Sequence, residues 1–576
     1  MVSNKPIRSR MQSHSKADLH VHSKYSDRPT EWFLRRVGAP ECYVEPLNVY
    51  RRAKARGMDF VTIADHNSIL GALEISHLPG TFVSDEVTTY FPENGSKIHL
   101  LVCGISEEQF RMIQELRESI YELHGYLLDE GITCAVNHPF YRINDRLTID
   151  QVEKLLLMFK RFELINGTRD RRGAALLKVI LESLTPTMID EMADRHALTP
   201  TGPEPWRKWT TGGSDDHSGV HTASAFTVTP AAADVSEYLA HLRDGRHEAA
   251  GTSGGSLLLA RSVYHVAYGY YKQRFLGSAS RPSILGQMLE RFVSPPVKSS
   301  QGWYRFVPGF VTRFVRARQV RRLSDAERTI VEEASRFAQN EDSGAPSISP
   351  DHDRHAFETV CRLSHLLSYN LIRRFLREFQ KGNIFDGIQS LASLGTVALG
   401  VAPYLASFSS QHKDEPFLRA LAGHFPGAET LAERGGGKAW ITDTLPRPKG
   451  TSLAELVARS ARNTAHPLTL LTCQEHTDAK GEACENFIPL GSFELPECDT
   501  ERISCPPFLE VIEYIERRGF DELVISTPGP LGLTGLAAAG LLGIQTTGVY
   551  QTDVPLLVRQ LTLDHAMEQL ARKYVL

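Results

Sequence analysis

The chain has 576 residues, of which 41% are hydrophobic and 23% are charged, and its formal net charge is −4. This length exceeds what one hydrophobic core serves, so two to four domains are expected, and the composition excludes a low-complexity chain. The near-neutral charge argues neither for nor against a nucleic-acid partner. The 8 cysteines form no Cys-x-x-Cys pair, which argues against a zinc knuckle. Residues 1–16 contain no apolar signal segment, so we predict a cytoplasmic protein.

The first informative stretch is Asp18–Asp27, which reads Asp-Leu-His-Val-His-Ser-Lys-Tyr-Ser-Asp. In a strand, side chains alternate between the two faces, so His20 and His22 would point to the same side. Two imidazoles followed by the carboxylate of Asp27 suit a borderline divalent metal. For this stretch alone, a surface strand with two idle histidines is the competing interpretation.

Short apolar runs then alternate with helical patterns up to about residue 255. This alternation predicts an α/β domain with a parallel sheet, either open or closed into a barrel. Ser106 with Gln109 and Thr148 with Gln151 are capping boxes, the first of them for a long helix reaching about Glu130. The expected elements are a helix at Pro46–Arg56, strands at Met58–Asp65, Thr81–Ser84, Ile98–Gly104 and Gly131–Asn137, a helix after Thr148, and strands at Phe162–Asn166 and Trp209–Thr211.

Polar side chains follow these strands at the point where each one ends, which is where α/β barrels assemble their sites. Taken singly, each could be a satisfied core or loop residue. Together they are hard to explain as packing, because unpaired buried imidazoles and carboxylates are costly and metals are their natural partners. They are His66, Glu86, His138, Asp215 and His217, with His99 lying inside its strand.

The motifs resemble those of the PHP family, the polymerase and histidinol phosphatase family, in order and spacing over residues 18–255. The resemblance implies a distorted (β/α)7 barrel and hydrolysis of phosphate esters by a metal-activated hydroxide. It also implies about two or three divalent ions, for which Mn, Fe, Zn and Mg are candidates. Ser84 departs from the glycine that many relatives have in this motif, and Asp215 is preferred to Asp216. The implied ligands are His20, His22, Asp27, His66, Glu86, His99, His138, Asp215 and His217.

Two arginine-containing loops follow strands of this domain, and guanidinium groups match phosphate geometry. Arg142 comes shortly after His138, and Arg169 follows the strand that ends at Asn166, with Arg171 and Arg172 close behind. We predict that Arg142 and Arg169 contact the phosphate of a small-molecule ester. Solvent-facing arginines are the alternative for each position.

Residues 258–437 show helical periodicity, with Phe357 to Phe379 repeating at steps of three and four. Gln339–Arg354 is expected to be a loop or a disordered insert. Arg305–Arg322 is basic and could contact phosphates, anionic lipid or nucleic acid, although a solvated helix face is the preferred interpretation. Leu391–Phe408 is apolar, but its glycines, its polar residues and Pro403 favour a buried helix pair over a membrane span.

Residues 438–576 contain strands at Lys438–Thr442, Leu468–Cys473, Glu522–Ser526 and Ile544–Tyr550, a pattern typical of a doubly wound α/β half-domain. The loop Thr527–Gly532 and the segment Tyr550–Pro555 resemble the amino-terminal lobe of a GT-B glycosyltransferase of family 4. Gln551 stands where relatives have histidine, and the expectation is that the nucleotide-sugar lobe is missing. The glycine loop before a helix could bind an anion, which is a weak signal alone.

These expectations divide the chain into three parts: a PHP barrel at 16–257, a helical connector at 258–437 and a Rossmann-like, incomplete glycosyltransferase lobe at 438–576. The predicted activity is metal-dependent hydrolysis of a small phosphorylated metabolite or a sugar phosphate. One alternative is a glycosyltransferase-related protein whose barrel is regulatory. Another is a scaffold without catalysis. The sequence does not indicate an oligomeric state.

Overall fold

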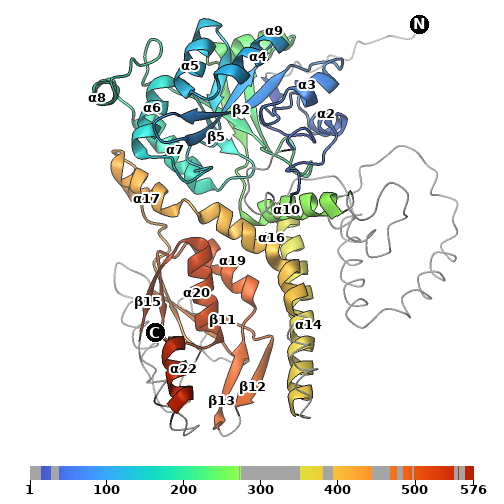
Figure 1. The fold of residues 1–576 in the computed structure, drawn as a ribbon, viewed down its shortest axis with the longest axis vertical. Coiled ribbons are helices and arrows are strands. Elements are labelled where there is room, and N and C mark those ends of the chain that lie inside the picture. Colours follow the sequence, from blue (N-terminus) through green and yellow to red (C-terminus); the bar gives the residue numbers. More distant parts are fainter. Residues whose placement is uncertain are drawn as a thin grey trace, which may run out of the picture. The chain divides into compact units, whose positions relative to one another are not determined.

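A computed structural model describes most of the chain as two compact units (Figure 1). Unit 1 comprises Met1–Ala356 and Ala420–Thr430, and unit 2 comprises Phe357–Arg419 and Leu431–Leu576. The predicted division into three domains stays a prediction. The described residues are 14–27, 38–271, 273, 350–380, 394–443, 468–475, 484–495, 498–549, 556, 559 and 565–575.

Unit 1 is built around a five-stranded sheet in the order β2-β3-β4-β5-β6. Its strands are β2 (Ser84–Phe91), β3 (Ser96–Cys103), β4 (Thr133–Val136), β5 (Arg161–Asn166) and β6 (Trp209–Gly213). A smaller antiparallel sheet in the order β1-β7-β8 contains β1 (His14–Ala17), β7 (Ala225–Pro230) and β8 (Glu248–Gly251).

Two extended segments outside the named strands close the large sheet into a ring. The residues after β1 bridge to the end of β6, with Val21 beside Asp216. The amide of Ala64 donates to the carbonyl of Val21, and the amide of Glu86 donates to that of Asp65. Each step around the ring is therefore a backbone hydrogen bond. The ring brings β2 and β6, at opposite edges of the sheet, back together.

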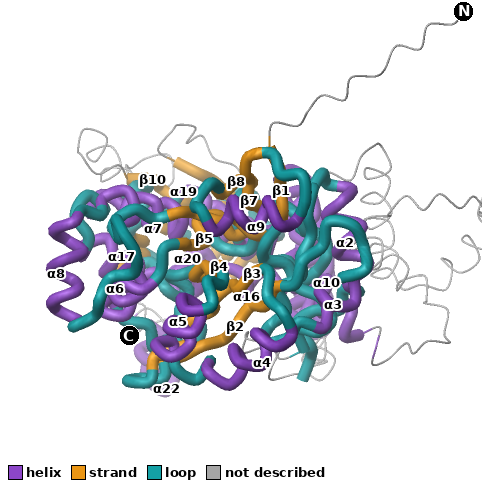
Figure 2. Tube along the Cα trace, turned by 90° about the horizontal axis from the view of Figure 1, so that it is seen from above, coloured by secondary structure: helices purple, strands orange, loops and turns teal. Residues whose placement is uncertain are grey.

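Helices surround this ring, as Figure 2 shows for α2 to α7 around β2 to β5. The predicted helix at Pro46–Arg56 is confirmed as α2, with Pro46 in its first turn. Both capping boxes are confirmed, at the starts of α4 and α6. The helices of this part are α2 (Pro46–Ala55), α3 (Leu70–Ile75), α4 (Glu107–Leu116), α5 (Ile120–Asp129), α6 (Ile149–Met158), α7 (Arg171–Ser183), α8 (Pro186–His196), α9 (Val235–Arg243) and α10 (Ser256–Tyr271).

Two local predictions for unit 1 are wrong. The sheet is mixed, because β2 pairs antiparallel with β3 and β3 with β4, and only β4, β5 and β6 run parallel. The turn between β2 and β3 is too short for a crossover and uses Gly95 at φ 68°. The long helix expected after Ser106 is two helices, because Ser119 caps the second one by accepting from the amide of Glu122.

The predicted strand at Met58–Asp65 and the first part of the stretch Asp18–Asp27 are joined to their neighbours by single bridges rather than forming regular strands, and a turn follows at Lys24–Tyr25. The alternation still has the expected effect on packing. Leu19 and Val21 are buried in two clusters of the apolar core, while His20 and His22 are buried on the other side. The parity argument therefore places the imidazoles correctly although the strand itself is not regular.

Unit 2 contains a parallel five-stranded sheet in the order β11-β10-β9-β14-β15. The four predicted strands correspond to β9 (Lys438–Ile441), β10 (Leu468–Cys473), β14 (Glu522–Ile525) and β15 (Gln545–Gly548). Sequence reasoning missed β11 (Cys484–Phe487) and the hairpin of β12 (Gly491–Leu495) and β13 (Cys498–Cys505). A parallel sheet agrees with a doubly wound half-domain, and the glycosyltransferase resemblance stays a prediction.

The helices after α10 in the chain include α14, α16 and α17, which confirm the helical periodicity predicted for the middle region. The stripe from Phe357 onward lies on α14, which begins at Pro350, so the loop predicted for Gln339–Arg354 is wrong for its last five residues, and residues 339–349 lie outside the described ones. The basic stretch Arg305–Arg322 and the segment from Gln551 to Pro555 lie outside the described residues. The elements are α14 (Pro350–Gln380), α16 (Leu394–His412), α17 (Glu415–His424), η3 (Glu429–Leu431), α19 (Phe508–Arg518), α20 (Pro530–Leu542) and α22 (His565–Val575).

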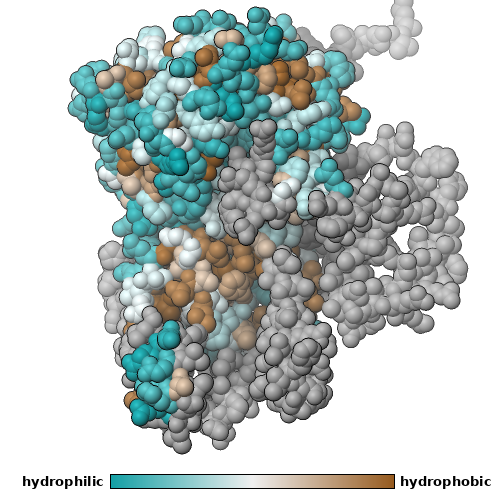
Figure 3. Space-filling model, viewed as in Figure 1, coloured by the Kyte–Doolittle hydropathy of each residue, from teal (hydrophilic) through white to brown (hydrophobic). Residues whose placement is uncertain are grey.

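None of the helices in the described ranges has the length and apolarity that crossing a membrane requires. The helix pair expected for Leu391–Phe408 is wrong over the described residues, because Leu394–His412 form one apolar helix, α16, with Pro403 inside it. On the face drawn in Figure 3, hydrophobic residues gather over the helices of unit 2. Helix α20 of unit 2 exposes Leu533 and Leu536, at 43% and 52%.

Candidate metal centre

Imidazoles and carboxylates from separate segments of the ring converge at one place in unit 1. Bridges set them side by side: His66 pairs with Glu86, and Val21, between His20 and His22, pairs with Asp216. In the β2–β3 hairpin Thr88 lies opposite His99, which places His99 diagonally from Glu86. The closure of the sheet is thus what collects these side chains from distant parts of the sequence.

Four groups of three side chains offer ligand atoms that lie within 4.8 Å of one another. Together these groups contain every ligand implied by the PHP resemblance except Asp27. Such spacing is short enough for one ion to bind all three atoms of a group after small rotamer adjustments. The groups are His22, His66 and His217; His20, His138 and Asp215; His20, His22 and Glu86; and His66, Glu86 and His99.

Glu86 is the centre of the cluster. Its side chain is fully buried, and one oxygen, Oε1, lies 3.0 Å from Nε2 of His20. Its other oxygen, Oε2, lies 2.9 Å from Nδ1 of His66. A carboxylate shared between imidazoles in this way is placed to bridge two cations. The remaining contacts are Nδ1 of His99 at 3.2 Å, Nε2 of His138 at 3.3 Å and Nε2 of His22 at 3.4 Å.

Asp215 is the second carboxylate of the cluster. Its Oδ1 lies 3.4 Å from Nε2 of both His20 and His22. Its other oxygen accepts hydrogen bonds from Thr168 Oγ1 at 2.9 Å and from Asn166 Nδ2 at 3.2 Å. These bonds fix the rotamer and leave Oδ1 directed at the imidazoles.

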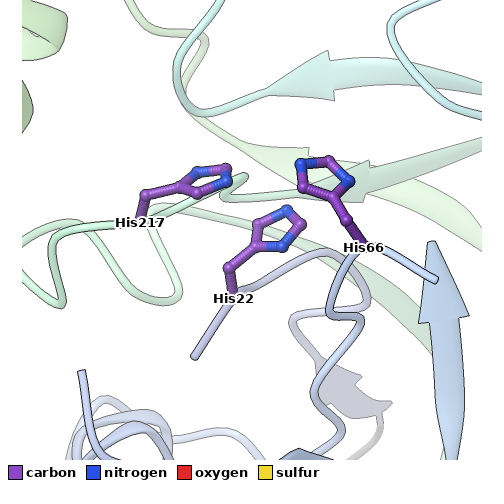
Figure 4. Close-up of side chains that lie close together, drawn as sticks. All are labelled: His22, His66 and His217. Carbon is purple, nitrogen blue, oxygen red and sulfur yellow. The ribbon is translucent and has the colours of Figure 1, made fainter. Parts of the chain in front are cut away.

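Three imidazoles, those of His22, His66 and His217, lie together on one side of the cluster, each from a different segment (Figure 4). The rings of His22 and His217 are stacked with centroids 3.9 Å apart, and the centroids of His22 and His66 are 4.6 Å apart. Imidazoles at this spacing are compatible with a shared cation, which would bind their unprotonated nitrogens.

The electrostatics of the cluster favour ionised carboxylates. Burial alone would raise the pKa of Glu86, but attraction to His20, His99 and His66 lowers it well below its usual range. The pKa of Asp215 also lies well below its usual range. Burial would raise this pKa, but interactions with His20, His22 and His217 outweigh burial. Both groups are therefore anionic over the physiological range and can serve as hard oxygen ligands.

The imidazoles divide into two types. Burial lowers the pKa of His22 to about 3 and that of His99 to about 4, which keeps both rings neutral and able to bind a metal. Burial opposes charge at His20 as well, but attraction to Glu86, Glu163 and Asp215 raises its pKa well above the usual value. The carboxylates thus favour positive charge at the centre of the cluster, which divalent cations also supply.

The unsatisfied atoms of the cluster fit a metal. Buried polar atoms are normally hydrogen-bonded, and exceptions call for an explanation. Across the described part of the chain, the buried atoms with no hydrogen-bond partner include Nε2 of His22, both ring nitrogens of His66 and His99, Nε2 of His217 and Oε2 of Glu86. These are the atoms that coordination would satisfy, so the residues present fit divalent ions.

A second layer of residues, which sequence reasoning missed, orients the cluster. Oε1 of Glu163 lies 2.8 Å from Nδ1 of His20, and its other oxygen accepts from the amide of His138. The side-chain amide of Asn137 donates to Oε1 of Glu86 at 2.9 Å. Glu163 lies within a strand and Asn137 at the end of one. The sequence-level signal was a polar residue within a largely buried strand for Glu163, and a polar residue directly before His138 for Asn137.

Asp18 is not one of the candidate ligands, but it fixes the backbone segments that carry two of them. Its carboxylate accepts from Ser214 Oγ at 2.5 Å, from the Ser214 amide at 2.9 Å and from the Ala223 amide at 2.7 Å. Burial raises the pKa of Asp18 to about 7, and these hydrogen bonds hold it below what burial alone would give. The carboxylate ties the loop that carries Asp215 to the segment that carries His20.

The backbone is strained where the ligands sit. His138 has φ 27° and Asp215 has φ 50°, values that residues other than glycine adopt at a cost of about 1–3 kcal/mol. Asn67, directly after His66, has φ 52°, and its side chain accepts from the Thr88 amide. Strain of this kind persists where the surrounding structure imposes it, as at functional sites.

The structure also shows the surroundings of Asp27, a predicted metal ligand, and of Arg142 and Arg169, the two predicted phosphate contacts. Asp27 is exposed and contributes no atom to the four groups, so its role as a ligand stays a prediction. Arg142 donates to the carbonyls of Leu147 and Asp145 and so braces its own loop. The guanidinium of Arg169 lies 3.5 Å from the ring centroid of Tyr141, and its charge helps to lower the pKa of Asp215.

No family model matches the chain. The uncharacterized protein MJ1587 of Methanocaldococcus jannaschii is 42% identical over 67 residues, which are 12% of this chain and 37% of that protein. The chain therefore matches about a third of that relative's length.

Three solved structures are similar to part of the chain. PsfC from Pseudomonas syringae is 15% identical with a TM-score of 0.27, covering 46% of this chain and 99% of that one. A protein assigned as a metal-dependent phosphoesterase from Bifidobacterium adolescentis is 15% identical with a TM-score of 0.21, covering 35% and 87%. An amidohydrolase from Chromobacterium violaceum is 16% identical with a TM-score of 0.19, with the same coverage. TM-scores of this size do not assign an activity to this chain.

Proposed function

We propose that unit 1 is a metal-dependent phosphoesterase of the PHP type, with its centre at the cluster around Glu86 and Asp215. The observation that carries the proposal is the convergence of buried imidazoles and carboxylates whose ligand atoms lie within 4.8 Å of one another and in part lack hydrogen bonds. The closed ring of strands and extended segments agrees with the (β/α)7 barrel that the sequence resemblance implies.

The residues that would hold the ions are those of the four groups. Glu86 and Asp215 supply anionic oxygens, and His20, His22, His66, His99, His138 and His217 supply ring nitrogens. Bound divalent ions lower the pKa of a coordinated water and polarise a phosphate ester. The chain's own contribution is to fix the donors: Glu163 orients His20, and Asn137 holds Glu86.

Arg169 is the residue best placed to orient the phosphate. Its guanidinium packs over the ring of Tyr141, and that ring lies edge-on to His138 with centroids 5.8 Å apart. Arg169 is thus held beside a ligand of the cluster by an aromatic platform, at low cost in conformational freedom. A planar guanidinium in this position would bind two phosphate oxygens at once.

The proposed substrates are small phosphate esters, such as a phosphorylated metabolite or a sugar phosphate. The sugar-phosphate preference rests on the predicted glycosyltransferase-like lobe, which is an analogy and not chemistry of the site.

The test is a panel of phosphate esters with the purified chain supplemented with Mn²⁺, Fe²⁺, Zn²⁺ or Mg²⁺. Changes in the outer shell of a metal site alone cost about 10–100-fold, so His20→Ala and Asp215→Ala are expected to lower kcat/KM at least about a hundredfold. The exposed His77→Ala is the matched control and should behave like the wild type. A folded, metal-supplemented protein that binds only trace metal and hydrolyses no ester would exclude the proposal.

A further inference from the structure

The environment of Glu41 sets it apart from the other acidic residues near the cluster. It lies in the loop before α2, follows no strand, and is 5% exposed. Its Oε2 is 3.5 Å from Nε2 of His66, and its Oε1 is 4.0 Å from Nε2 of His217. The two carboxylate oxygens therefore face the two imidazoles that flank His22 in Figure 4.

The ring nitrogens of His66 and His217 that face Glu41 have no hydrogen-bond partner within the described part of the chain. Nε2 of His66 and Nε2 of His217 are buried and form no hydrogen bond with any described residue. The other nitrogen of each ring points elsewhere, since Nδ1 of His66 faces Glu86 and Nδ1 of His217 lies 3.0 Å from the carbonyl of Asp215. Within this arrangement Nε2 is thus the nitrogen of His217 that is directed at Glu41.

Asp27 lies in a different environment. The sequence resemblance implies that Asp27 joins this group, but its side chain is exposed. The preceding residue, Ser26, is buried: its hydroxyl donates to Asp65 and lies 2.9 Å from Nδ1 of His22. The chain is therefore anchored one residue before Asp27, in an arrangement that leaves Asp27 outside the cluster.

We propose that Glu41, and not Asp27, is the carboxylate ligand of a divalent ion held by His66 and His217. This inference rests on the proposed metal centre and names one of its ligands. A carboxylate with two imidazoles is a donor set that Zn²⁺, Mn²⁺ and Fe²⁺ accept, with remaining positions open to water or substrate. The position differs from that of Glu86, which approaches His66 at the other ring nitrogen, Nδ1.

Metal content of the full-length chain is the test, with the rival variants Glu41→Gln and Asp27→Asn and the matched control Glu45→Gln, an exposed residue of the same loop. Each purified protein is equilibrated with Mn²⁺ or Zn²⁺ alone, and bound metal is measured by elemental analysis and by titration. Glu41→Gln is expected to lose about one equivalent per chain, or to bind it at least about tenfold more weakly. Asp27→Asn and Glu45→Gln should match the wild type.

The outcomes separate the two proposals. If Asp27→Asn loses the equivalent and Glu41→Gln keeps it, or if neither variant loses metal, Glu41 is not the ligand, while the metal centre stands. If the wild type itself binds no metal, the proposed function fails first. Because glutamine has the shape of glutamate, circular dichroism of Glu41→Gln without added metal should equal that of the wild type. A variant that has lost its fold is replaced by Glu41→Asp, which should keep the metal with weakened affinity.

Discussion

At the scale of single residues, the phosphate contact is the most direct part of the proposal to test. Arg169→Ala removes a guanidinium that packs on the ring of Tyr141. The substitution should lower kcat/KM by at least about tenfold, which is about 1.4 kcal/mol of transition-state stabilisation. Arg169→Lys should recover little, because an ammonium cannot bind two oxygens at once. The matched control is Arg171→Ala, which removes an exposed arginine two residues away.

Arg142→Ala distinguishes the two predicted phosphate contacts. Because Arg142 donates to carbonyls of its own loop, its removal should lower the stability of that loop more than it affects the chemical step. The measurement is the steady-state kcat/KM of Arg142→Ala and of the three variants at Arg169 and Arg171, all with the same phosphate ester. Equal kcat/KM for Arg169→Ala and the wild type would contradict the assignment of Arg169.

The residues of the cluster were largely predictable from the sequence because each one follows or lies in a recognisable apolar run. His66, His138 and Asp215 stand at segment ends, so their convergence follows from the closure of the sheet. Glu41 was missed because it lies in an irregular loop, where no periodicity indicates which way a side chain points. The exposed position of Asp27 was equally beyond a pattern argument, since it depends on how Ser26 anchors the chain.

At the scale of elements, helix boundaries were predicted best where a capping side chain determines them. Ser106 and Thr148 form the expected capping boxes. The antiparallel pairing of β2, β3 and β4 was not predictable from alternation alone, because a strand that returns by a short turn and one that returns by a helix have similar apolar runs. The signal that could have distinguished them is the turn sequence Asn94-Gly95 between two apolar runs, which is typical of a hairpin.

Glu153, on α6, contacts α8 and the part of α17 that belongs to unit 1, and it gives a prediction at this scale. It is 2% exposed, and its oxygens lie 2.5 Å from Nη1 of Arg195 and from Nε2 of His196 on α8, and 2.7 Å from Nε2 of His424 on α17. Burial alone would raise the pKa of Glu153, but hydrogen bonds from His424, His196 and Arg195 outweigh it and lower the pKa. The ionised carboxylate is thus what stabilises this junction.

The sign of the pH dependence follows from that lowered pKa. A carboxyl group whose folded-state pKa lies below its unfolded value of 4.5 stabilises the protein above that value, and the stabilisation is lost as the pH falls through the folded-state pKa. Glu153→Gln should lower the free energy of unfolding at pH 7 by about 1–3 kcal/mol and weaken its decline below pH ~4.5. Urea unfolding as a function of pH measures both, with the exposed Glu182→Gln on α7 as the control. A variant with the stability and pH dependence of the wild type would show that the junction contributes nothing.

At the scale of the whole molecule, the two units are built on different sheets, and only unit 1 gathers a cluster of ligands among its described residues. In unit 2 the glycine loop before α20 was predicted as a possible anion site. The carboxylate of Asp443 occupies that position in the structure. Asp443 accepts from the amides of Leu531 and Gly532 at 2.7 and 3.1 Å and from Thr527 Oγ1 at 2.7 Å. An internal carboxylate thus satisfies the start of this helix.

The two-unit organisation predicts that metal stabilises the protein locally. Ions that bind only the folded state add about 2.7 kcal/mol of stability at a free concentration a hundredfold above Kd, which for a unit of this size corresponds to a rise in Tm of about 3–4 °C. Calorimetry of the full chain should therefore show two transitions, of which only that of unit 1 moves to lower temperature when a chelator removes the metal. Glu153→Gln identifies the transition of unit 1, because that residue and its partners all lie there. Two transitions that both stay at the same temperature when the chelator is added would contradict a metal centre in the cluster. A single transition that the chelator lowers would show that the units unfold as one cooperative body.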